Sequence, residues 1–223
     1  MFEIPMDFHL LEKYIINYEK EPVEKGKILF YGHSLFTRWA ASYGNIPLEE
    51  MITMKDGSRA IVNHGFGTST SEEQLYYYPR MVRAWEPRAL VIATFANDSM
   101  YGYGPEDTMR NLAKMLAWAR ADFPGIKLFV VEPHPYPEMR GADPNDLWNG
   151  GLHQRGKFIR TIHAYADTHE DTEVITLWDR PELFETPEDV GNFRKIREDI
   201  YLDDRIHPNA QGFEIYAEIF RQA

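Results

Sequence analysis

The sequence contains no cysteine among its 223 residues. This absence excludes disulfide bonds, thiolate nucleophiles and metal sites built on thiolates. A metal ion would need histidine and carboxylate ligands, and the eight histidines show none of the spacings typical of such sites. The sequence therefore predicts no metal site.

Basic residues are also scarce. The chain has 24 lysines and arginines against 35 aspartates and glutamates, which gives a net charge of −11. Proteins that bind nucleic acid neutralise its phosphates with clustered basic side chains, and this chain has no basic run. The composition argues against nucleic acid and against anionic membrane surfaces as partners.

Long hydrophobic runs are missing as well. Charged residues interrupt the apolar positions throughout residues 1–25, so this segment resembles neither a signal peptide nor a membrane span. We therefore expect a cytoplasmic protein. Hydrophobic residues make up 43% of the chain, enough to supply the core of one large domain.

Short apolar runs recur at wide spacing and predict strands buried on both faces: 28–31, 60–63, 90–94, 128–131 and 174–177. Segments with helical periodicity separate most of these runs. Strands that alternate with helices pair in parallel through right-handed crossovers. The sequence therefore predicts a single α/β domain with a five-stranded parallel sheet between two helical layers.

Four segments fall outside this alternation or interrupt it. Apolar positions in residues 11–18 recur at helical spacing, so residues 1–25 are expected to form an N-terminal helical extension packed on a main domain of residues 26–223. Pro79 should kink or restart a helix predicted between residues 72 and 85. Two long irregular stretches, 133–151 and 179–203, have the length of functional loops.

Reactive side chains follow several of the predicted strands, at the sheet edge where ligands bind in open parallel sheets. Ser34 follows the first strand, Asn97 follows the third, and Asp204 and His207 precede the last helix. Acyl transfer needs a hydroxyl nucleophile, a base oriented by a carboxylate, and donors for the oxyanion. These residues supply that set.

Four blocks of the sequence then resemble a known family: Ile-Leu-Phe-Tyr-Gly-His-Ser-Leu at 28–35, Val-Asn-His-Gly-Phe-Gly-Thr at 62–68, Phe-Ala-Asn-Asp at 95–98 and Asp-Arg-Ile-His-Pro at 204–208. They are similar to the motifs of the GDSL or SGNH hydrolases, serine esterases on a flavodoxin-like three-layer sandwich. The resemblance implies Ser34 as nucleophile, His207 as general base and Asp204 as its orienting carboxylate. It also implies an oxyanion hole made by the backbone amides of Ser34 and Thr68 and the side-chain amide of Asn97, with no cofactor.

The chain departs from the family pattern at three positions. His33 replaces the usual aspartate before the nucleophile, and Thr68 and Phe95 replace glycines. None of these changes removes a reacting group. The branched side chain of Thr68 is expected to narrow the acyl side of the pocket and to favour a small acyl group.

Substrate contacts are expected from residues near these blocks and from the long loop after the fourth strand: His33, His64, Met100, Tyr101 and Trp148. Aromatic faces there could stack on sugar rings or accept an acyl chain. We therefore expect an esterase that removes acetyl or other short acyl groups from a small molecule or an oligosaccharide. A lysophospholipase or thioesterase and an inactive sugar-binding pseudohydrolase are the alternatives, and a homo-oligomer is left open.

Overall fold

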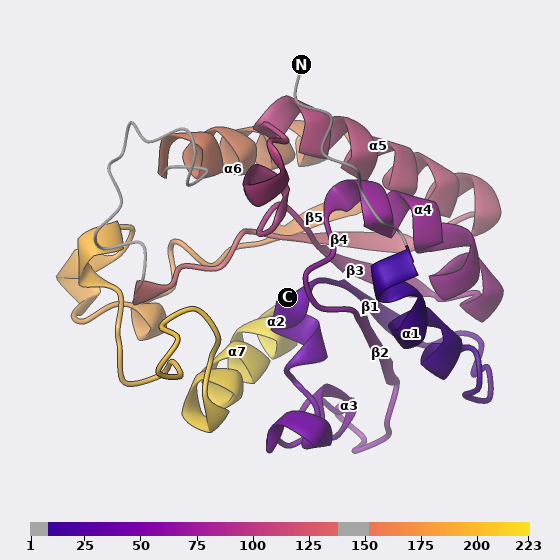
Figure 1. Ribbon diagram of the computed structural model, residues 1–223, viewed down its shortest axis with the longest axis horizontal. Helices are drawn as coiled ribbons and strands as arrows, with labels where there is room; N and C mark the ends of the chain where they lie inside the picture. Colours follow the sequence, from indigo (N-terminus) through magenta and orange to yellow (C-terminus); the bar gives the residue numbers. More distant parts are fainter. Residues whose placement is uncertain (1–8, 138–151) are drawn as a thin grey trace.

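The computed structural model describes residues 9–137 and 152–223. Its centre is a sheet of five parallel strands in the order β2-β1-β3-β4-β5 (Figure 1). The strands are β1 Ile28–Gly32, β2 Ile61–Gly65, β3 Ala89–Ala93, β4 Lys127–Val131 and β5 Thr172–Ile175. This is the α/β fold and the strand number that the sequence predicts. The predicted strand boundaries differ from the observed ones by no more than two residues.

Helices cover both faces of the sheet, so the molecule has three layers (Figure 1). One face carries α1 His9–Tyr18, α4 Ser71–Met81, α5 Pro105–Asp122 and α6 Leu152–Ala166. The other carries α2 Ser34–Thr37, α3 Leu48–Met51 and α7 Ala210–Gln222. No helix in the described part of the chain is long and apolar enough to cross a membrane.

Each face of the sheet has its own hydrophobic core because side chains alternate along a strand. On β1, Leu29 and Tyr31 enter the core under α4 and α5, whereas Phe30 enters the core under α7. Trp39 and Phe213, both fully buried, pack together in the second core with ring centres 5.0 Å apart. These two cores hold the carboxyl ends of the strands in fixed positions.

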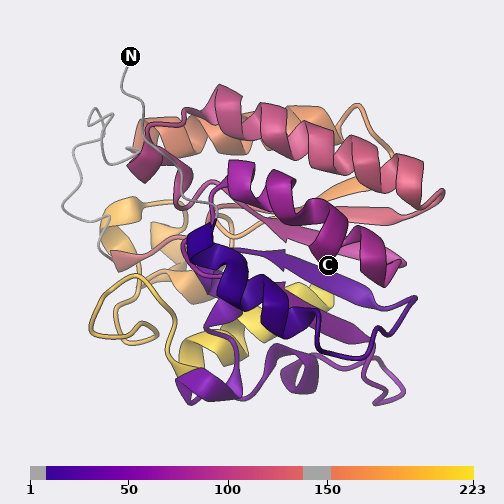
Figure 2. The same ribbon diagram turned by 45° about the vertical axis from the view of Figure 1, so that its right-hand side comes forward.

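The N-terminal helix belongs to the first of these cores. Leu11 and Ile15 are buried there, and α1 lies beside α4 (Figure 2). The hydroxyl of Tyr18 donates a hydrogen bond of 2.6 Å to the carbonyl of Gly65 at the end of β2. These contacts bring α1 to the edge where β2 ends.

The helix that contains Pro79 starts and ends at identifiable signals. Thr70 and Glu73 form a capping box at its N-terminus. The helix continues through Pro79 and ends at Met81, before a short turn at residues 83–85. The helix therefore continues for two residues past Pro79, which lacks only its own N–H donor, and the predicted interruption comes after Met81.

Candidate active site

Ser34 lies at the first turn of α2, directly after β1. The Nδ1 atom of His33 accepts a hydrogen bond of 3.3 Å from the amide of Leu35 and so caps this helix. Asn63 holds the other end, donating 2.9 Å to the carbonyl of Phe36. Gly65 allows the close approach of α2, since a Cβ there would lie 2.3 Å from the amide nitrogen of Thr37. Ser34 is therefore held firmly at the end of the sheet.

A hydrogen-bond chain links the three residues that the family resemblance assigns to catalysis. The Oγ of Ser34 lies 3.0 Å from Nε2 of His207, although the two residues are 173 positions apart. Nδ1 of His207 lies 2.7 Å from Oδ2 of Asp204. Nδ1 must donate to the carboxylate, so Nε2 of the neutral imidazole is left to accept the serine proton.

The turn between Asp204 and His207 is stabilised from both sides. Oδ1 of Asp204 accepts hydrogen bonds from the amides of Ile206 at 3.0 Å and His207 at 2.9 Å. On the other side, Nε2 of His134 lies 3.2 Å from the carbonyl of Ile206 and donates to it. His134 follows β4, so it ties this turn to the sheet.

The protonation states of the pair suit base catalysis. Burial disfavours the charged form of Asp204, but hydrogen bonds from the amides of His207 and Ile206 and from the imidazole outweigh it and lower its pKa to about 2. Burial lowers the pKa of His207 below its usual value, Asp204 opposes that shift, and the charge of Arg38 adds to it. Near neutral pH, Asp204 is ionised and His207 is neutral.

The expected oxyanion donors surround the same cavity. Ser34, Thr68 and Asn97 all line a pocket of about 330 Å³. One proton of the Asn97 amide is donated to the carbonyl of Ser69 at 2.9 Å. An amide nitrogen carries two protons, so the second is available to a ligand in the pocket.

A buried network holds the two turns that carry these donors. The carboxylate of Asp98 is fully buried and accepts from the amide and hydroxyl of Ser71, and from the hydroxyl of Thr108 at 2.9 Å. Gln74 bridges the hydroxyl of Ser69 at 3.2 Å and the carbonyl of Ala93 at 3.1 Å. The turn after β2 and the turn after β3 are thereby joined.

Thr68 and Phe95 occupy backbone conformations that favour glycine. Their φ angles are +66° and +79°. Both stand where the family pattern has glycine, so the chain keeps the left-handed turns without the residue that adopts them freely. The exposed Thr68 carries its strain beside the pocket, whereas Phe95 is buried and its ring stacks on Phe158 at 4.6 Å.

Further residues line the pocket that sequence reasoning did not identify: Tyr14, Arg38, Tyr43, His134, Tyr136 and Ile206. Two of them, His134 and Tyr136, follow β4, and the rule used for the other strand ends would have found them. Tyr14 lies within residues 11–18, whose apolar spacing predicts only a packed helix. Of the residues expected to bind substrate, Met100 lines the pocket and is exposed.

The structure corrects the expectation for His33 and His64. His33 is buried behind Ser34 as a helix cap and does not line the pocket. His64 is fully buried between the rings of Tyr18 and Trp85, and its Nδ1 lies 2.7 Å from the carbonyl of Met81. It points to the opposite face of β2 from Asn63, because successive side chains on a strand alternate.

The remaining two expected contacts are not in the described pocket. Tyr101 lies next to Met100 in a short turn of residues 98–101 but does not line the cavity. Trp148 lies outside the described residues.

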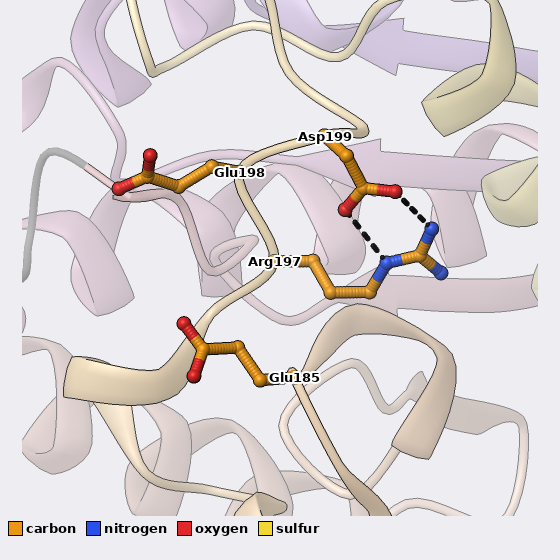
Figure 3. Close-up of a pocket in the computed structure, with 4 residues that line it drawn as sticks. All are labelled: Glu185, Arg197, Glu198 and Asp199. Atoms are coloured by element: carbon orange, nitrogen blue, oxygen red, sulfur yellow. Dashed lines mark hydrogen bonds and ion pairs between the residues drawn. The ribbon is translucent and has the colours of Figure 1, made fainter.

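A second hollow lies on the long segment after β5 and is lined by Glu185, Arg197, Glu198 and Asp199 (Figure 3). Arg197 pairs with Asp199 through two nitrogen atoms, while Glu185 and Glu198 lie apart from that pair (Figure 3). Across residues 9–137 and 152–223, no group of three potential ligands is arranged to hold a metal ion. The pocket at Ser34, with its hydrogen-bond chain to Asp204, is therefore treated as the candidate active site.

Solved structures with the same fold include several ester hydrolases. A GDSL-like lipase from Bacteroides thetaiotaomicron has a TM-score of 0.72 and 18% identity, with 97% of each chain covered. A lipase/acylhydrolase from Enterococcus faecalis has a TM-score of 0.66 and 17% identity, covering 88% of this chain and 94% of that one. A variant of an acetyl-xylooligosaccharide esterase from Geobacillus has a TM-score of 0.63 and 15% identity, and the match covers 91% of this chain and 95% of that one.

These identities are low, and the likenesses show the fold alone. No curated protein matches the sequence significantly. The sequence does match the model of the GDSL-like lipase/acylhydrolase family over residues 30–215. Because this match spans most of the chain and the fold agrees with it, the chain belongs to the GDSL-like lipase/acylhydrolase family and is a carboxylic ester hydrolase.

Proposed function

We propose that this hydrolase removes acetyl or other short acyl groups from a soluble alcohol, such as an acetylated oligosaccharide, with Ser34 as nucleophile. The observation that carries the proposal is the hydrogen-bond chain from Ser34 through His207 to Asp204, with distances of 3.0 Å and 2.7 Å. It supplies a hydroxyl, a neutral base and an ionised carboxylate in the order that ester hydrolysis requires.

In the first half of the reaction, Nε2 of His207 takes the proton of Ser34 as its Oγ attacks the ester carbonyl. Asp204 stabilises the imidazolium that forms. His207 then gives the proton to the leaving alcohol, and an acyl group remains on Ser34. In the second half, His207 deprotonates a water molecule that attacks this acyl group, and its proton returns to Ser34 as the carboxylic acid leaves.

The negative charge on the carbonyl oxygen needs donors that are already in position. We assign this role to the backbone amides of Ser34 and Thr68 and to the side-chain amide of Asn97. The hydrogen bond from Asn97 to the carbonyl of Ser69 supports the role of Asn97, because this bond fixes the orientation of its side-chain amide. The Asp98 network supports both turns.

Several features favour a short acyl group and a polar alcohol. The side chain of Thr68 lines a cavity of about 330 Å³, which leaves little room for a long chain beside the other groups. The rings of Tyr14, Tyr43 and Tyr136 border the same cavity and provide faces for a sugar ring. The similar fold of an acetyl-xylooligosaccharide esterase adds support.

The alternatives fit less well. A lysophospholipase or thioesterase needs an apolar trough, whereas this pocket has Arg38 and Asn97 among the residues of its wall. A sugar-binding pseudohydrolase would not need an unbroken chain from Ser34 to Asp204. The observations favour an active esterase of short acyl groups.

A fluorophosphonate probe tests the nucleophile directly, because it reacts only with an activated serine. We expect one probe per chain in the wild-type protein and none in Ser34→Ala, with the same circular dichroism spectrum for both. A panel of p-nitrophenyl esters from acetate to octanoate then tests acyl length. Absence of labelling would contradict the proposal, and preferred cleavage of the octanoate would favour the lipase-like alternative.

A further inference from the structure

The residues that line the described pocket include an arginine and no carboxylate, although the chain as a whole is acidic. The chain carries a net charge of −11, yet no aspartate or glutamate lines the described part of the cavity. Arg38 is the cation on its wall, since the burial of His207 and His134 lowers the pKa of both imidazoles and keeps them neutral.

Arg38 is held in a fixed position next to the nucleophile. It follows Ser34 by one helical turn, and its backbone amide donates a hydrogen bond of 3.0 Å to the carbonyl of Ser34. Residues four apart lie on the same face of a helix, so both side chains face the pocket. The carbonyl of Arg38 accepts a hydrogen bond of 2.8 Å from the side chain of Asn45. The guanidinium carbon of Arg38 lies 5.6 Å from the centre of the Tyr43 ring.

The guanidinium nevertheless keeps its hydrogen-bonding capacity. It forms an ion pair with Oδ2 of Asp204 at 3.6 Å, a distance too long for a hydrogen bond. Asp204 already accepts from two amides and from His207. Among the described residues, no hydrogen bond involves the Arg38 guanidinium, and the side chain is 33% exposed. Its donors are free to bind a ligand.

The position of Arg38 indicates which half of an ester it meets. Arg38 lies on the side of Asp204 and His207, and Nε2 of His207 is the atom that protonates the leaving alcohol in the proposed reaction. The proposed oxyanion donors Thr68 and Asn97 come from the turns after β2 and β3. A group bound to Arg38 therefore belongs to the alcohol portion of the substrate.

We propose that Arg38 binds a carboxylate on the alcohol portion, so that the substrates are short acyl esters of acidic alcohols such as hydroxy acids or acidic sugars. This inference rests on the proposed esterase function and specifies its substrate class. A guanidinium presents two parallel N–H groups that match a carboxylate, and such charged hydrogen bonds are stronger than neutral ones. The tyrosines at the pocket wall would flank the same portion.

A matched pair of esters tests the proposal: meta-acetoxybenzoate, which carries the carboxylate, and meta-acetoxybenzamide, its neutral isostere. After correction for their rates of hydroxide hydrolysis, we expect the wild-type enzyme to favour the benzoate in kcat/KM by about tenfold or more. The preference should fall as salt is added, because salt screens a half-exposed ion pair. A preference near one would overturn the proposal.

Variants separate binding of the carboxylate from an effect on His207. Arg38→Gln should lower the preference about tenfold, and Arg38→Lys should retain part of it. Both esters use the same Ser34, His207 and Asp204, so a change in the charge around His207 cancels in the ratio. Arg88→Gln, the same change at the amino end of β3, is the control and should leave the ratio unchanged. An unchanged ratio in Arg38→Gln would mean that Arg38 acts only on the Asp204–His207 pair.

Binding can be measured without turnover. In the Ser34→Ala background, calorimetry with meta-acetoxybenzoate should give a Kd that rises about tenfold when Arg38→Gln is added, whereas the Kd for the benzamide should stay constant. Equal Kd values for the benzoate would count against the Arg38 site. Failure of the wild-type protein to hydrolyse either ester or to react with a fluorophosphonate would count against the esterase function instead.

Discussion

The carboxylate of Asp98 accepts hydrogen bonds from both the amide and the hydroxyl of Ser71, 27 residues earlier in the chain. Asp98 follows Asn97, and Ser71 follows the turn that carries Thr68. The contact therefore sets the distance between two proposed oxyanion donors. Burial raises the pKa of Asp98, and the hydrogen bonds from Ser71 and Thr108 oppose that shift.

Removal of this carboxylate should affect both stability and rate. Asp98→Ala leaves the Ser71 and Thr108 donors without a partner, so we expect the free energy of unfolding to fall by about 2 to 4 kcal/mol. We also expect kcat to fall about 10- to 100-fold, because small displacements of positioned groups are costly in catalysis. Urea unfolding and initial rates measure the two effects.

Asp98→Asn serves as the conservative variant, since its amide oxygen still accepts from Ser71. It should recover most of kcat, and Asp167→Ala at an exposed position should change neither quantity. A full loss of stability in Asp98→Ala with an unchanged kcat in the folded fraction would show that the network has no part in positioning the donors.

The pH dependence should follow the ionisation of His207. Only the neutral imidazole accepts the serine proton, so kcat/KM should rise with pH as His207 loses its proton. Since burial lowers its pKa, the midpoint should lie below the ordinary histidine value of 6.5. His33, with a pKa lowered by burial to about 3, and Asp204, near 2, should add no inflection between about pH 5 and 8.

Substitution of the orienting carboxylate should move this profile. Asp204 raises the pKa of His207, so Asp204→Asn should shift the midpoint to lower pH and reduce the plateau by about 10⁴. Direct NMR titration of His207 gives its midpoint independently. If that midpoint lies between about pH 5 and 8 and the rate does not vary with pH over the same range, this histidine is not the base.

The side-chain donor of the oxyanion hole can be removed cleanly. Asn97→Ala should reduce kcat by about 10² to 10³ with a smaller effect on KM, because the donor acts mainly when the carbonyl oxygen becomes an anion. Steady-state kinetics with p-nitrophenyl acetate measure the split. An effect confined to KM would make Asn97 a ground-state binding residue.

Thr68→Gly should relieve the backbone and widen the pocket. A β-branched residue at a φ of +66° is strained, so glycine should raise the free energy of unfolding by up to about 1 kcal/mol after its larger unfolded-state entropy is counted. Turnover of acetyl esters should survive and that of longer esters should improve. Thr68→Ala is the control, because it widens the pocket but keeps a Cβ at positive φ and should not stabilise the protein.

Much of the fold follows from local sequence patterns. Apolar runs such as residues 28–31 and 90–94 are buried on both faces, and such runs are typical of parallel strands between helical layers. The capping residue Thr70 and the helical spacing of apolar residues define helices in the same local way. Ser34 and Asn97 were expected at the same edge because a parallel sheet brings the ends of its strands together there.

The sequence by itself determined which predicted strands are followed by reactive residues, the net negative charge and the absence of thiol groups. Only the tertiary structure decided that His33 and His64 are buried, and that Tyr14 and Arg38 face the pocket. A strand end predicts where a residue lies, but the direction of its side chain depends on the packing of distant helices. The contact between Ser34 and His207 spans 173 residues, and only the folded sheet and α7 together bring the two side chains within hydrogen-bond distance.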